Sequence, residues 1–289
     1  MTSPVEVRIV NAFVKDGEGG NPAGVVLDAD ALTAAQKQAV ARLAGLPETA
    51  FVSRSAVASV KLEFFTPTRQ IAHCGHATIA TFSLLRQLGR LDGQAASKET
   101  IDGLRSITLD GDQAFMAQTA PVMEALPPGI TPGDVARGLG LAAADLREAC
   151  VVSTGNRFLL VEVATPQRLA GLAPDMPAIA RISDALDLIG VYAYVVTSDG
   201  PARATTRMFA PRYGIAEESG TGMAAGPLAC LLWQHGRVRD TAFELEQGRF
   251  MSPPSVSRLR VRLEITDQRI TGLAVGGSAR IMSSRALEV

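Results

Sequence analysis

The chain has 289 residues, of which 47% are hydrophobic and 20% are charged, a balance typical of folded globular proteins rather than disordered ones. Its formal net charge is -1 and no dense Lys/Arg run occurs, which argues against a nucleic-acid-binding surface. The N-terminus leads directly into an alternating strand rather than a signal peptide, and three widely spaced cysteines favour a reducing compartment. We therefore expect a cytoplasmic protein that binds neither nucleic acid nor a membrane.

The first half of the chain is predicted to consist of strands interrupted by two helices. Residues 33–44 are typical of an amphipathic helix, with Thr33 as its N-cap and Gly45 as its stop. Residues 75–89 predict a helix that is apolar on every side and is therefore buried. Alternating apolar residues predict strands at 5–10, 23–27, 46–52, 60–65, 105–109 and 113–118.

The second half begins with a segment at 119–132 that contains four prolines, which we interpret as a linker. A second apolar helix is predicted within 219–236, where Pro227 requires either a late start or a kink near the start. Further helices are predicted near 132–139, 142–149 and 175–188, and strands at 150–153, 157–163, 191–197, 204–209, 242–247, 258–266, 270–274 and 278–282. Strands outnumber helices and few βαβ units occur, so the fold class is α+β.

Two stretches of the chain resemble each other and each ends in one of the apolar helices. Phe65-Thr-Pro aligns with Phe209-Ala-Pro, and, after three extra residues in the second copy, Gly75 aligns with Gly222. A repeat this long indicates two similar domains rather than a solenoid. The predicted domains are residues 1–118 and 119–278, and the terminal strand 279–289 can return to the first domain.

Gly75 and Gly222 each stand at the predicted N-terminus of a buried helix. Backbone N–H groups and the helix dipole favour an anion at such a position. If a pseudo-two-fold relates the domains, both helix starts can face one cleft. A small carboxylate substrate is what such a cleft would hold.

The tetrapeptide His73-Cys74-Gly75-His76 suggests metal ligands at first sight. The chain has only three histidines and no second cysteine pair at ligand spacing, whereas a structural zinc site takes four ligands in paired clusters. We therefore expect no metal. An imidazole at the start of a helix is better suited to hydrogen bonding and to proton transfer near neutral pH.

Several motifs follow one another in the order found in a known family. These are Gly20-Asn21-Pro22-Ala23, Leu46-Pro47-Glu48-Thr49-Ala50-Phe51-Val52, Phe65-Thr66-Pro67, Cys74-Gly75-His76-Ala77-Thr78, Arg207-Met208-Phe209-Ala210-Pro211, Glu217-Glu218-Ser219-Gly220-Thr221-Gly222-Met223-Ala224-Ala225-Gly226-Pro227 and Glu246-Gln247-Gly248. Across residues 7–281 the chain resembles the phenazine-biosynthesis (PhzF-like) isomerase family. The resemblance implies a diaminopimelate-epimerase-like fold, in which two pseudo-symmetric domains each wrap a curved, mostly antiparallel sheet around a central helix. It also implies a site between the domains, no cofactor and a homodimer.

The same resemblance assigns roles to individual residues. The family's catalytic acid/base glutamate falls on Glu48, its active-site histidine on His76, and its acidic residue before the second glycine turn on Glu218. The family usually has aspartate at that last position, and a serine where this chain has Met223. The expected substrate contacts are Cys74, Gly75, Ser219, Gly220, Thr221, Gly222 and Met223. The two departures leave the substrate open and keep proton transfer as the expected chemistry.

We therefore predict a cofactor-independent isomerase of a small carboxylate, in which Glu48 moves the proton. One alternative is a thiol-dependent amino-acid epimerase or racemase that uses Cys74, although Glu218 or Ser219 stands where the second thiol would be. Another alternative is a small-acid-binding protein that has lost turnover, which is consistent with Met223.

Overall fold

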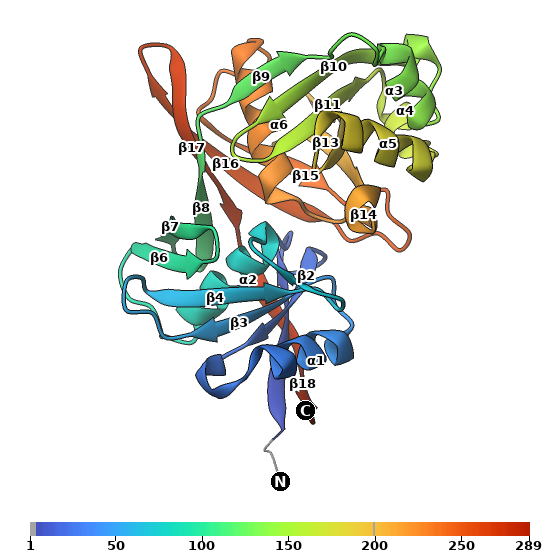
Figure 1. Cartoon of the computed structure of the whole chain (residues 1–289). Coiled ribbons are helices and arrows are strands. Elements are labelled where there is room, and N and C mark those ends of the chain that lie inside the picture. Colours follow the sequence, from blue (N-terminus) through green and yellow to red (C-terminus); the bar gives the residue numbers. More distant parts are fainter. Residues whose placement is uncertain (1–3, 199) are drawn as a thin grey trace. The chain divides into compact units, whose positions relative to one another are not determined.

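The computed structural model describes residues 4–198 and 200–289, and their contacts divide the chain into two compact units, each described here by itself (Figure 1). The first unit comprises Met1–Ala117 and Gly276–Val289, and the second comprises Gln118–Val275. The chain passes from one unit to the other within two strands, β8 (Gln113–Thr119) and β17 (Arg269–Gly277).

The first unit is a sheet with one helix on each face. Its strands are β1 (Val5–Ala12), β2 (Asn21–Val26), β3 (Thr49–Ser53), β4 (Val60–Phe65), β5 (Gln70–Ile71), β6 (Ala95–Thr100), β7 (Gly103–Asp110), the start of β8, and β18 (Ala279–Leu287). Its helices are α1 (Ala34–Ala44) and α2 (Gly75–Gln87). The pairs β1–β18, β1–β2, β3–β4, β4–β5, β6–β7 and β7–β8 are antiparallel, whereas β2–β3 and β4–β6 are parallel.

Helix α1 covers one face of this sheet. The Thr33 side chain accepts from the Gln36 backbone N–H while the Gln36 side chain accepts from the Thr33 N–H, and Gly45 ends the helix at a positive φ of 64°. Both predicted helix boundaries are therefore confirmed, and the reciprocal bonds form a capping box. The helix buries Val40 and Ala44 in a cluster that includes Phe51 and Phe65 of the neighbouring strands.

Helix α2 lies on the opposite face of the sheet. Phe51 and Phe65 point toward α1, and the residues next to them in their strands point toward the other face, because side chains alternate along a strand. Every residue from Gly75 to Leu85 is buried, and α2 contacts β1, β2, β3, β7 and β18. The prediction of a central buried helix is confirmed. Within the part of the chain that the structure describes, no helix is both long and apolar enough to cross a membrane.

The second unit repeats this arrangement with more helices. Its strands are β9 (Val122–Ala125), β10 (Leu146–Ser153), β11 (Arg157–Val163), β12 (Gly190–Val196), β13 (Ala202–Ala210), β14 (Ile215–Glu218), β15 (Ala242–Gln247), β16 (Ser257–Thr266) and most of β17. Its helices are α3 (Pro132–Gly138), α4 (Pro166–Ala170), α5 (Met176–Leu186) and α6 (Gly222–Gln234). Figure 1 shows α3, α4 and α5 gathered together, apart from α6.

The order of strand pairing is the same in both units. Strands β10–β11, β12–β13, β13–β14 and β15–β16 pair antiparallel, as β1–β2, β3–β4, β4–β5 and β6–β7 do. Strands β11–β12 and β13–β15 pair parallel, as β2–β3 and β4–β6 do. Helices α2 and α6 are thus the crossovers of equivalent parallel pairs. The predicted α+β fold, mostly antiparallel and built around two central helices, is confirmed.

Helix α6 is continuous from Gly222 and contains Pro227 near its start. The predicted late start is therefore not observed, and a kink near the start stays a prediction. Its residues from Ala224 to Leu232 are all buried. Alternation along β12 separates the two faces of this sheet, because Val191, Ala193 and Val195 join the cluster with α3 and α5 while Tyr192 and Tyr194 face the other way.

Two predictions for the start of the second unit are wrong. Residues predicted as a helix near 142–149 form only a short 3-10 turn at Ala143–Asp145 and then strand β10. The predicted linker at 119–132 contains strand β9, which pairs with β10 from Cys150 to Ser153. β10 has strand partners on both edges, and these backbone bonds outweigh a helical pattern that is weak in isolation.

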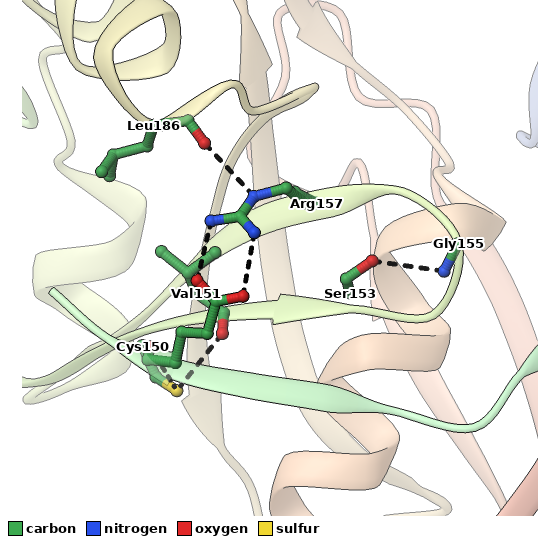
Figure 2. A network of polar contacts seen from close by, with 7 residues as sticks. Cys150, Val151, Ser153, Gly155, Arg157 and Leu186 are labelled. Carbon is green, nitrogen blue, oxygen red and sulfur yellow. Dashed lines mark hydrogen bonds and ion pairs between the residues drawn. The ribbon is translucent and has the colours of Figure 1, made fainter. Parts of the chain in front are cut away.

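Side chains around β10 reinforce this strand arrangement (Figure 2). Arg157 donates two hydrogen bonds to the Glu124 carboxylate, at 2.9 and 3.0 Å, and a third to the Leu186 carbonyl oxygen at 3.3 Å. The Cys150 thiol lies 3.5 Å from the Glu124 carbonyl oxygen. A bidentate arginine therefore joins β9 and β11 to the end of α5.

Gly190, the first residue of β12, lies at a closely packed position of the second unit, and a substitution there tests this packing. A Cβ at Gly190 would lie 2.5 Å from the Phe209 carbonyl oxygen, whereas one at Gly138 would meet nothing closer than 3.6 Å. We expect Gly190→Ala to lower the free energy of unfolding by about 1–3 kcal/mol through overpacking. Gly138→Ala is the control and should change it by less than about 1 kcal/mol. Equal effects in urea denaturation would contradict the close approach.

Candidate active site

Glu48 is held at the junction between α1 and β3. Its side chain is buried, and the residue is 8% exposed. The Gly24 N–H donates to the Glu48 carbonyl oxygen at 2.9 Å, and Gly24 pairs with Thr49 at the start of the parallel β2–β3 ladder. A Cβ at Gly24 would lie 2.7 Å from Thr49 Oγ1, so only glycine allows the strands to approach this closely. The backbone that carries Glu48 is therefore fixed by the sheet.

His76 lies between Glu48 and Cys74. His76 Nε2 is 3.2 Å from Glu48 Oε2, at ion-pair distance rather than in hydrogen-bond alignment, and His76 Nδ1 is 3.7 Å from Cys74 Sγ. All three side chains are buried, and His76 is 4% exposed. One ring nitrogen thus faces a carboxylate and the other a thiol, which places the three sequence-predicted residues of this unit together.

Burial raises the pKa of the Cys74 thiol, against the opposing charge of His76. The thiol is therefore protonated near neutral pH and can donate to His76 Nδ1, which leaves Nε2–H directed at the carboxylate side. The donor atoms of Glu48, Cys74 and His76 all lie within 4.8 Å of one another, as a single cation would require. A cation would have to displace the thiol proton, and the raised pKa opposes that.

Cys74 is also the N-cap of α2, and its carbonyl is tied into the first turn. Thr78 donates to the Cys74 carbonyl oxygen from its backbone N–H at 3.3 Å and from its hydroxyl at 2.6 Å. The sequence places Gly75 directly after this residue, where helix geometry leaves N–H groups without intrahelical acceptors. The predicted anion-binding position at Gly75 therefore adjoins the Cys74–His76 pair.

Lys98 of β6 is a buried residue in this cluster that was not expected from the sequence. It is 0% exposed, and its Nζ donates to Thr78 Oγ1 at 2.7 Å and to His73 Nδ1 at 3.2 Å. It also lies 5.2 Å from the centroid of the Phe64 ring. The sequence of strand β6 has no alternating pattern of apolar residues, so it does not predict a strand. A lysine in such a segment is expected to be solvated.

The charges in this cluster shift both basic groups. Burial, opposed by Cys74 and Asp102 and assisted by Arg105, lowers the pKa of Lys98 to about 7. Burial and the charges of Lys98 and Arg105 lower the pKa of His73 to about 3. His73 is therefore neutral and accepts at Nδ1, so its proton is on Nε2.

In the second unit, Glu218 ends β14 and contacts the N-cap of α6. The Thr221 hydroxyl donates to Glu218 Oε2. Gln247 donates from Nε2 to the Glu218 carbonyl oxygen at 2.7 Å and to Thr221 Oγ1 at 3.0 Å, and accepts at Oε1 from the Thr221 N–H at 3.0 Å. The Gln247 amide thus holds the turn that carries Ser219, Gly220 and Gly222.

Gln247 is itself oriented from beneath the turn. Tyr192 donates to Gln247 Oε1 at 3.0 Å, and Thr206 Oγ1 lies 2.9 Å from the Tyr192 hydroxyl. These residues come from β12, β13 and β15 and are all buried. In the sequence Gln247 belongs only to a motif, and nothing there links it to Tyr192.

The remaining predicted positions lie around the same turn. Ser219, Gly220 and Thr221 are buried, and Met223 is half-buried in the first turn of α6. Glu217, the residue before Glu218, accepts two hydrogen bonds of 2.8 Å from Arg207. The two neighbouring acids of β14 therefore differ in their contacts, since Glu217 pairs with an arginine and Glu218 contacts the start of α6.

Each unit thus brings a carboxylate to the start of a central helix, and only the first adds an imidazole and a thiol. This combination defines a class of fold and site suited to acid/base chemistry on small molecules. Residues 10–285 match the family model described as phenazine biosynthesis-like protein (PhzC-PhzF). The chain belongs to this family, as its motifs predicted.

Individual relatives agree with this assignment. A protein of Deinococcus radiodurans named an uncharacterized isomerase is 35% identical over 94% of this chain and 91% of its own length. The trans-2,3-dihydro-3-hydroxyanthranilate isomerase of Pseudomonas chlororaphis is 29% identical over 93% of this chain and 94% of its own. A crystal structure of a Bacillus anthracis phenazine biosynthesis protein of the PhzF family covers 100% of both chains with a TM-score of 0.90 and 25% identity. The prediction of an isomerase is confirmed at the level of this family.

The Lys98 environment predicts a pH dependence of stability. In the unfolded chain lysine keeps its usual pKa of 10.5, and in the fold the pKa is about 7. Between these values the unfolded chain binds more protons, so the free energy of unfolding should rise with pH. We expect Lys98→Met to remove at least about 1 kcal/mol of this rise between about pH 7 and about pH 9.5 in urea denaturation. Lys61→Met, on the neighbouring strand, should keep it, and a rise that survives Lys98→Met would contradict the assignment.

The Tyr192 hydroxyl should contribute to stability through Gln247. We expect Tyr192→Phe to lower the free energy of unfolding by about 1–2 kcal/mol, because it removes a donor to a buried amide oxygen. Tyr194 is equally buried on the same face of β12, and its hydroxyl makes no hydrogen bond to the residues that the structure describes. Tyr194→Phe is therefore the matched control. If the two substitutions lower the midpoint of thermal denaturation equally, the hydrogen bond from Tyr192 to Gln247 does not contribute to stability.

Proposed function

We propose that the chain is a cofactor-independent isomerase that moves a proton within a small carboxylate substrate, with Glu48 as the base and then the acid. The observation that supports this most directly is the buried Glu48 carboxylate 3.2 Å from His76 Nε2. A carboxylate in such surroundings is suited to take a proton from carbon and to return it. A fixed backbone on both sides of Glu48 supports a defined position for that transfer.

The proposed reaction balances within the substrate. The C–H bond next to the carboxylate or enol breaks, its proton goes to a Glu48 oxygen, and its electron pair enters the conjugated system. Glu48 then returns the proton to another carbon, so that the composition of the substrate is unchanged. His76 orients the carboxylate of Glu48 and polarises the substrate during both steps.

Carboxylate binding is assigned to the two helix starts. The N–H groups near Gly75 and Gly222 are the proposed donors, because helix N-termini favour anions. Glu218 is proposed to position the substrate, together with Ser219, Gly220, Thr221 and the side chain of Cys74. Met223 offers no hydroxyl where the family has serine, which favours a less polar substrate than that of the Pseudomonas relative.

The thiol-dependent alternative is less well supported. Burial raises the pKa of Cys74, so the thiolate that such chemistry needs is disfavoured. From the sequence, Glu218 or Ser219 was expected where the second thiol would be, whereas the helix starts make Thr221 equivalent to Cys74, since both are N-caps. None of these three residues carries a thiol. The homodimer and the cytoplasmic location implied by the sequence stay predictions.

The proposal is tested by following deuterium from heavy water into the substrate. The probes are trans-2,3-dihydro-3-hydroxyanthranilate, named for the Pseudomonas relative, and a panel of small unsaturated carboxylates. We expect Glu48→Gln to slow incorporation by about 10²–10⁴-fold, the usual contribution of a general acid/base group. Cys74→Ala should keep most of the rate, and the exposed Glu6→Gln should keep all of it.

The outcomes separate the alternatives. An inactive Cys74→Ala beside an active Glu48→Gln would establish thiol chemistry instead. The unaltered chain can also bind acids of the panel in calorimetry while no deuterium enters them. In that case the proposal of an isomerase acting on these acids fails, and the alternative of a small-acid-binding protein is supported.

A further inference from the structure

Lys98 is a buried cation whose contacts are all neutral. Its three partners are the Thr78 hydroxyl, the neutral His73 ring and the face of the Phe64 ring. Among residues 4–198 and 200–289, no carboxylate lies within ion-pair distance of its Nζ. A buried charge without a counter-charge is unfavourable, so the charged form of Lys98 costs free energy in this fold.

The fold itself does not need this charge, as the second unit demonstrates. Phe65 and Phe209 are equivalent, and the register of the parallel pairs β4–β6 and β13–β15 then makes Lys98 equivalent to Leu245. Leu245 is also 0% exposed. The helix residue above it changes in parallel, because Thr78 is equivalent to Ala225. An apolar pair therefore supports the central helix of the second unit.

Lys98 lies directly beneath the start of α2. Thr78, which accepts from Nζ, donates through its hydroxyl to the carbonyl oxygen of Cys74, the N-cap. The other charged or titratable groups that act on Lys98 are His73, Cys74, Arg105 and Asp102. The charge thus adds to the positive end of the helix dipole at the first turn.

We propose that Lys98 is a specificity-determining residue, whose buried charge beneath the first turn of α2 makes that turn select carboxylate ligands over neutral ones. This inference rests on the proposed function, which assigns a substrate carboxylate to the same turn. Lys98 contacts no ligand itself and acts through the field that it adds and through the Thr78 contact that anchors Cys74.

Carboxylate binding and protonation of Lys98 are then linked. A bound anion stabilises the ammonium form, so carboxylates bind most tightly below about pH 7, where Lys98 is charged in the free protein. Their affinity falls as the pH rises and Lys98 loses its proton. The affinity for a neutral ligand of the same shape does not depend on pH in this way, since its binding does not stabilise the charged form of Lys98.

The experiment compares acids with their amides by calorimetry. The probes are anthranilate with anthranilamide and cyclohex-1-enecarboxylate with its amide, each at about pH 6 and about pH 8.5. We expect Lys98→Met to weaken the carboxylates about tenfold or more at the lower pH and to change the amides less than about twofold. Only the unaltered chain should lose carboxylate affinity between the two pH values.

Three controls make the result decisive. Lys61→Met removes a lysine from the same sheet and should leave both ligand types unchanged. Lys98→Leu introduces the side chain found at the equivalent position of the second unit, and it replaces Lys98→Met if that variant does not fold. Circular dichroism and thermal denaturation verify the fold of each variant.

The proposal is overturned if acids and amides lose affinity by the same factor, or if no carboxylate binds to the unaltered chain. Calorimetry needs no turnover, so these outcomes are independent of the deuterium experiment. Carboxylate selectivity that depends on Lys98, together with full activity of Glu48→Gln, would refute only the proton transfer.

Discussion

The constraint on which the rest of the structure depends is the burial of two helix starts. Helices α2 and α6 are apolar around their circumference and enclosed by strands, so the polar groups of their first turns cannot rely on water. Thr78 satisfies the Cys74 carbonyl in one unit, and Gln247 satisfies the Thr221 N–H in the other. Polar side chains therefore gather where each helix begins, which is also where the helix dipole favours an anion.

The two copies share a backbone plan but differ in chemistry. Pairing of β3 with β4 and of β12 with β13 makes Glu48 equivalent to Gly190, where the Phe209 carbonyl oxygen leaves no room for a side chain. Lys98 is likewise equivalent to Leu245. The first unit thus carries the Glu48 carboxylate, the imidazole and the buried cation, whereas the second carries a turn held by Gln247. The single base proposed here, Glu48, suits transfer of one proton between carbons on one face of a substrate.

Much of the fold could be predicted because its signals are local. The capped helix at 34–44 has a capping box and a terminal glycine, and both central helices are mostly apolar runs with very few charged residues that begin at aligned glycines. Strand β10 was mistaken in part for a helix, because its stability comes from partners on both edges rather than from its own residues. Strand β6 was also missed, because its own residues show no apolar alternation. Lys98 is buried by its contact with helix α2, which the local sequence does not reveal.

The sequence by itself determined the duplication, the buried helices and the family, and it predicted Glu48, His76 and Glu218 as site residues, because each depends on residue types at fixed spacing along the chain. Only the tertiary structure decided that Glu217 pairs with Arg207, that Tyr192 orients Gln247, and that Lys98 lies buried without a counter-charge. Those contacts join strands far apart in sequence, and their register is set by sheet pairing across the whole unit. From the sequence alone a charged or polar side chain is expected to be solvated, and only the pairing of distant strands shows that it is enclosed.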